Sequence, residues 1–148
     1  MMQPLNSFDE LSQGQELQFG SFTMTEPEIL DFARRFDPQP FHVDPERAKG
    51  TIFGGLIASG LHTQAAAFGH ILRTGLFEKV SLGGTEQVVR WPAPVRPGDE
   101  IAVSARVEEL IPSRSKPDRG VAKIRYFGTR TSDGVVVLDI LGTHFLKR

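Results

Sequence analysis

The chain has 148 residues, with 18 acidic and 17 basic side chains and no cysteine. The missing cysteine excludes disulfides, thiolate metal sites and cysteine nucleophiles. A formal charge of -1 gives no field that would hold nucleic acid. No stretch reads as a membrane span or a targeting segment. We therefore expect a cytoplasmic protein, with one domain over residues 1–148, that is a small enzyme or a binding module.

The first part of the chain predicts a strand followed by a helix. Leu17–Thr23 alternates loosely between apolar and polar residues, as a strand does. Thr25 then has the character of a helix N-cap, with Glu28 three residues later. Apolar residues recur at helical spacing from there to Phe36. The segment Asp37–Pro45, which holds three prolines, ends this helix and reads as a rigid polar loop.

A second helix is expected between Ser59 as its N-cap and Gly75 as its stop. Its apolar positions follow the i, i+4, i+7 and i+11 spacing, and three consecutive alanines make its middle slim. The apolar positions are Leu61, Ala65, Phe68 and Leu72. A helix that is apolar over so much of its circumference is expected to be wrapped by other elements.

The remainder of the chain predicts strands. The four runs are Thr85–Trp91, Ile101–Val107, Val121–Thr131 and Val135–Leu146. Asp133–Gly134 lies between the last two and is a strong hairpin signal. We expect an α+β fold in which one strand and the helices precede a four-strand antiparallel meander, and the strands curl around the central helix.

Two segments carry candidate chemistry. Asp37 and His42 lie five residues apart on the proline-rich segment, where a carboxylate and an imidazole can share one water, although a histidine on a loop is usually only solvated. Further on, the Gly60 amide at a helix start is suited to an oxyanion, although the glycines of Phe53–Gly60 also fit simple tight packing. The spacing of these glycines excludes a P-loop or dinucleotide motif.

Other site types find less support. His62 and His70 are too far apart on one helix to chelate a metal together, and no serine-hydrolase elbow occurs around Ser59. The basic residues of the loop at 113–119 are typical of a solvated hairpin, and they also suit the phosphates of a nucleotide-tailed substrate. These basic residues are Arg114, Lys116 and Arg119.

Taken together, Ala33–Pro45 and Gly54–Thr63 resemble the MaoC-like dehydratase family, which includes the (R)-specific enoyl-CoA hydratases. The resemblance implies a hot-dog fold, in which an antiparallel sheet wraps a long central helix. It also implies that Asp37 and His42 are the catalytic pair and that the Gly60 N–H polarises the thioester carbonyl. The sequence departs from the hydratase pattern at Gln39, where those enzymes have Asn, and at Ser59, where many have His.

The resemblance implies a reversible hydratase or dehydratase of an acyl-CoA or acyl-carrier thioester, with no metal or cofactor. The expected substrate contacts are Gly60, Ser59, Gln39, Phe41 and Ile57, with Phe68 as a further residue of the acyl tunnel. Exposed sheet edges and the family resemblance both point to a homodimer. Two alternatives stay open: a hot-dog thioesterase, disfavoured because the central helix has no acid, and a non-catalytic binding member of the family.

Overall fold

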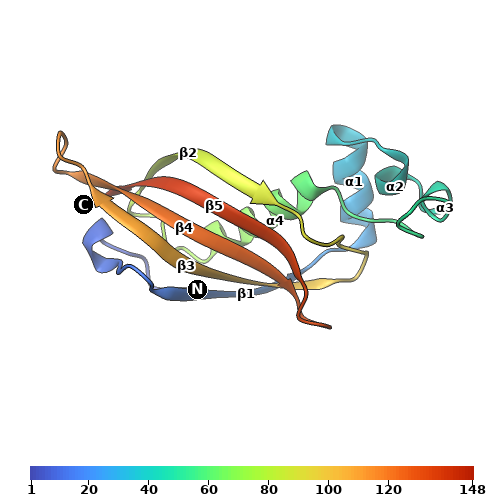
Figure 1. The fold of residues 1–148 in the computed structure, drawn as a ribbon, viewed down its shortest axis with the longest axis horizontal. Helices are drawn as coiled ribbons and strands as arrows, with labels where there is room; N and C mark the ends of the chain where they lie inside the picture. Colours follow the sequence, from blue (N-terminus) through green and yellow to red (C-terminus); the bar gives the residue numbers. More distant parts are fainter.

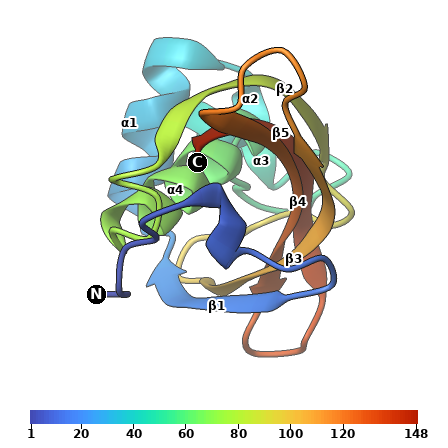
Figure 2. The same ribbon diagram turned by 90° about the vertical axis from the view of Figure 1, so that its left-hand side faces the viewer.

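The computed structural model describes residues 1–148, in which five antiparallel strands form one curved sheet around a long helix. Figure 2 looks along the curve, with α4 inside it, β1 at one edge and β2 at the other. The elements are η1 (Phe8–Glu10), β1 (Glu16–Thr23), α1 (Glu26–Phe36), α2 (Pro40–Val43), α3 (Pro45–Ala48), α4 (Gly60–Arg73), β2 (Ser81–Arg90), β3 (Glu100–Pro112), β4 (Arg119–Arg130) and β5 (Val136–Lys147). This is the α+β hot-dog arrangement that the sequence predicts. None of the helices combines the length and apolar character needed to cross a bilayer.

The strand order is β1-β3-β4-β5-β2, which corrects the predicted four-strand meander. Only β3, β4 and β5 follow one another as neighbours, and β2 pairs with β5 at the far edge. Nine residues, three of them prolines, separate β2 from β3, and this is longer than the loop of a tight hairpin. The segment between them instead crosses the open end of the sheet, where α1, α2 and α3 also lie (Figure 1).

Helix α1 begins with the expected capping box. The Glu28 backbone N–H donates to Thr25 Oγ1, and the Thr25 N–H donates to the Glu28 carboxylate. Ile29 and Ala33 are fully buried on its inner face. Phe36, which the spacing places on the same face, is 58% exposed because the helix ends beside it.

Helix α4 faces the sheet with Thr63, Ala67 and Ile71, which are all at most 2% exposed. The apolar stripe read from the sequence lies on a different face, and its ends, Leu61 and Leu72, are 49% and 45% exposed. The spacing of apolar residues does not determine which of two apolar faces of a helix packs against the sheet. In α4 the face with Thr63 and Ala67 packs there, because these small side chains allow the strands to approach the helix closely.

The segment expected to be an irregular loop contains one turn of helix, α2, which begins at Pro40. Proline is excluded from helix interiors but is tolerated in the first turn, where its missing N–H costs no hydrogen bond. The turn is short because the chain reverses again at Asp44, whose carboxylate caps α3 by accepting from two backbone N–H groups.

Candidate active site

Asp37 and His42 come together at the junction of α1 and α2. Asp37 is the C-cap of α1, where its N–H donates to Ala33 O at 2.9 Å. His42 lies on α2, and its Nε2 is 3.3 Å from Asp37 Oδ2. The proline-rich segment therefore brings the predicted carboxylate and imidazole within contact distance.

A hydrogen bond to the backbone fixes the orientation of the His42 ring. Its Nδ1 lies 2.7 Å from Ile57 O, a carbonyl that can only accept, so Nδ1 carries a hydrogen. The Ile57 N–H in turn donates to Phe41 O at 3.0 Å, which ties the two segments together. With Nδ1 occupied and the ring buried, Nε2 is the nitrogen that faces Asp37 and remains for chemistry.

Asp37 accepts two side-chain hydrogen bonds. Gln39 Nε2 donates to Oδ1 at 2.8 Å, and Ser59 Oγ donates to Oδ2 at 2.7 Å. Burial on its own raises the pKa of Asp37, but the two hydrogen bonds and the nearby His42 outweigh it, so the pKa lies below the ordinary value of 3.8. The carboxyl is therefore ionised at neutral pH.

Ser59 precedes α4 as expected, but its side chain does not cap the helix. The hydroxyl is fully buried and turned to Asp37 instead. The N–H groups of Gly60 and Leu61 in the first turn have no partner within the protein. Unpaired amides at a helix N-terminus favour a negatively charged or polarised oxygen.

These groups open into one cavity of about 500 Å³. Its lining residues are Asp37, Gln39, Phe41, His42, Phe53, Ile57, Ala58, Gly60, Leu61, Thr63, Trp91, Pro92, Ala93, Pro94, Val95 and Val137. Of the seven expected site residues, six line it, and Ser59 lies behind it in contact with Asp37. Phe68 does not belong to this cavity, because it lies two turns further along α4 in a depression beside β2.

One wall of the cavity was not anticipated. It consists of Trp91 to Val95, the segment that follows β2, and of Val137 at the start of β5. The sequence signal is the single tryptophan of the chain, set beside prolines, but the sequence pattern predicts Trp91 only as the last residue of a strand. Their place at the site depends on the strand order, which local patterns do not reveal.

The other candidates lie elsewhere. His62 stacks on Phe32, and His70 and His144 contact the Phe19 carbonyl and the Tyr126 hydroxyl. No three His, Asp or Glu side chains come together as metal ligands would. The basic residues at 113–119 lie at the far end of the β3–β4 hairpin and do not line the cavity (Figure 1). In this chain they are a surface hairpin loop, and Arg119 pairs with its neighbour Asp118.

Comparison with known proteins places the chain in a family. Residues 10–134 match the model of the MaoC like domain. The chain belongs to this family. An uncharacterized protein of Bacillus subtilis, YdeM, is 35% identical over 109 residues, which are 73% of this chain and 77% of that protein.

A second relative of this MaoC-like chain is named for an activity. It is the (R)-specific enoyl-CoA hydratase of Rhodospirillum rubrum, 30% identical over 111 residues, which are 74% of this chain and 75% of that enzyme. Among solved structures, a MaoC-like dehydratase from Rhodospirillum rubrum superposes with a TM-score of 0.87 and 33% identity, covering 95% of both chains. The chain thus belongs to a family of hydratases and dehydratases with the hot-dog fold.

Proposed function

We propose that this protein catalyses the reversible addition of water to a 2-enoyl thioester, with Asp37 and His42 as the catalytic pair and Gly60 N–H as the oxyanion donor. The observation that carries this proposal is the 3.3 Å contact between Asp37 and His42 in an apolar cavity beside an unpaired helix amide. The relative named as an enoyl-CoA hydratase supports the reaction class.

The proposed steps balance without another reactant. The Asp37 carboxylate takes a proton from water as the water oxygen bonds to C3 of the substrate, and the alkene electrons move onto the thioester oxygen. The Gly60 N–H stabilises that oxygen, and loss of such a donor typically costs about 3 kcal/mol of barrier. In the proposed step both ring nitrogens of His42 carry a hydrogen at the start, so Nε2–H protonates C2, and the proton that Asp37 has taken then passes to Nε2 across the 3.3 Å contact.

The proposed substrate is an acyl thioester carried by CoA or by an acyl-carrier protein. The apolar side chains of Phe41 and Ile57 line the space where the acyl group would lie. Gln39 and Ser59 act through Asp37, since both donate to its carboxylate. The proposed chemistry uses a carboxylate, an imidazole and a backbone amide, and it calls for no metal or cofactor.

The functional unit that we propose is a homodimer joined through β2. Strand β2 pairs only with β5, and all but one of its residues are exposed. Leu82 and Val88 on β2 are large apolar side chains at 50% and 47% exposure, and Val88 lies beside Leu141 on the outer face of the sheet. The opposite edge strand, β1, exposes mainly polar residues, which favours β2 as the contact.

The proposal is tested by replacing the pair in crotonyl-CoA hydration, followed as loss of the conjugated enoyl absorbance. Asp37→Asn and His42→Ala should each lower kcat by about 10²–10⁴-fold, the usual contribution of acid–base groups. Asp31→Asn, an exposed change six residues earlier on α1, serves as the matched control. Wild-type rates in both folded variants would contradict the assignment of these residues.

A further inference from the structure

The segment Trp91–Arg96, here called the wall segment, is fastened to the chain that leads into α4. Three hydrogen bonds join it to residues 53–60, one at its first residue and two at its last two residues. These bonds are Trp91 Nε1 to Gly60 O (2.8 Å), Ala58 N to Val95 O (2.8 Å) and Arg96 Nη2 to Phe53 O (2.5 Å). The wall segment therefore fixes the backbone on both sides of Ser59.

The contact between Trp91 and Gly60 is unusually close. A Cβ atom added to Gly60 would lie 2.6–2.8 Å from atoms of the indole ring, closer than real Cβ contacts allow. Residue 60 is therefore glycine because the ring occupies the place of its side chain, and its φ is not in the left-handed region. The indole covers this turn, and its N–H fixes the direction of the Gly60 carbonyl.

This contact acts on the proposed oxyanion donor. Gly60 is one of the residues that line the cavity, and it carries both the carbonyl that Trp91 binds and an N–H without a partner in the protein. A donor is effective only when its N–H points at the oxygen that becomes charged. Rotation of the first turn of α4 would misdirect that N–H, and a misplacement of about 1 Å can cost on the order of 10²-fold in rate.

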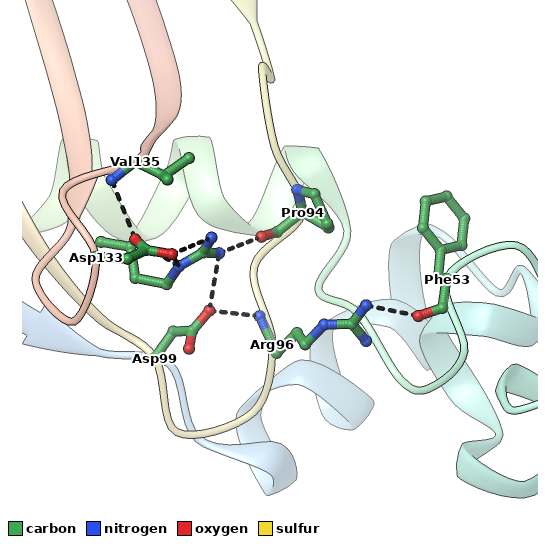
Figure 3. Close-up of polar contacts among 7 residues, drawn as sticks. Phe53, Pro94, Arg96, Asp99, Asp133 and Val135 are labelled. Carbon is green, nitrogen blue, oxygen red and sulfur yellow. Dashed lines mark hydrogen bonds and ion pairs between the residues drawn. The ribbon is translucent and has the colours of Figure 1, made fainter.

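The wall segment is anchored from outside the cavity by Arg130 at the end of β4. Arg130 Nη1 donates to Pro94 O at 2.8 Å, and Asp133 holds the guanidinium through Nε and Nη2 (Figure 3). Asp99 completes the arrangement, since its Oδ2 accepts from Arg96 N at 2.9 Å and lies 3.5 Å from Arg130. The Arg130 side chain is 17% exposed, so water screens these contacts only in part.

We propose that Trp91 is a positioning residue that aims the Gly60 N–H at the thioester oxygen, and that Arg130 holds the wall segment in the place from which Trp91 does so. The proposal rests on the hydration reaction proposed above. It adds two residues on which the polarisation of the thioester depends: Trp91, which lines the cavity, and Arg130, which lies outside it.

Two variants separate this role from packing. Trp91→Phe keeps an aromatic ring against Gly60 and removes the N–H donor, and Arg130→Gln releases the wall segment at Pro94. Each should lower kcat for crotonyl-CoA about tenfold with little change in KM, since the loss falls on the transition state. Arg119→Gln is the matched control, because it removes an arginine paired with aspartate at the opposite end of the same strand.

The deciding readout is the infrared carbonyl stretch of bound butyryl-CoA, a saturated thioester that cannot be hydrated. The wild-type protein and the Arg119→Gln control should lower this frequency relative to free butyryl-CoA, and Trp91→Phe and Arg130→Gln should lower it less. If Arg130→Gln does not fold, Trp91→Phe decides alone. If the wild-type protein hydrates crotonyl-CoA and Trp91→Phe keeps the wild-type kcat or the wild-type carbonyl frequency, this inference is overturned and the proposed hydration is not. Absence of hydration by the wild-type protein would overturn the proposed reaction and this inference together.

Discussion

At the scale of single residues, the candidate site consists of a carboxylate, an imidazole and the groups that orient them: Ser59 and Gln39 donate to Asp37, and the Ile57 carbonyl accepts from His42. Asp37 and His42 lie five apart on one segment, so a local motif reveals them. Ser59 was expected to cap a helix, because its sequence neighbours favour that role. Its hydroxyl instead donates to a carboxylate 22 residues earlier, a partner that only the packing of α1 against the start of α4 provides.

Removing the Ser59 hydroxyl should shift the pH dependence of the reaction. The hydrogen bond from Ser59 helps to lower the pKa of Asp37, so Ser59→Ala should raise that pKa toward its ordinary value of 3.8. Because the proposed mechanism needs the carboxylate, activity is lost as the pH falls through this pKa. The acid limb of kcat/KM should therefore move to higher pH in Ser59→Ala and stay in place in Ser21→Ala, an exposed control on β1. A limb that stays or moves to lower pH would argue against Asp37 as the base.

At the scale of elements, signals that lie within one segment predicted the structure well. The capping box of α1, the alternation of β3 and the turn at Asp133–Gly134 all appear as expected. The predicted position of β2 is wrong, because the prediction treats strands that are neighbours in the sequence as neighbours in the sheet. The sheet has to enclose α4, and this separates β1 and β2 to opposite edges.

The exposed edge of β2 gives a prediction about assembly. The wild-type protein should sediment at twice the 16.4 kDa mass of the chain. Val88→Lys should shift it toward the single chain, because edge lysines oppose strand pairing and two copies would bring like charges together. Gln18→Lys places the same charge on the other edge strand, β1, and should leave the dimer intact. A wild-type protein of 16.4 kDa, or an equal effect of both variants, would exclude a β2 interface.

At the scale of the whole molecule, the site forms where four distant parts of the chain meet at one end of the sheet. These parts are residues 37–42, 53–63, 91–95 and 137. The first two carry the motifs that the sequence revealed, and the last two supply the wall that it did not. The unpredicted wall of the cavity and the wrongly predicted position of β2 have the same cause, since the wall segment reaches α4 only because β2 lies at the far edge of the sheet.

The proposed hydration is tested most directly by incubating the wild-type protein with 2-enoyl-CoA thioesters of graded chain length in the presence of a thiol reagent. We expect loss of the conjugated absorbance without release of free thiol. Fluorescence of Trp91, the only tryptophan, reports binding in the same samples. Release of thiol would indicate a thioesterase. A saturable change in Trp91 emission with no loss of absorbance at any chain length would indicate a binding protein, and either result would contradict the proposed hydration.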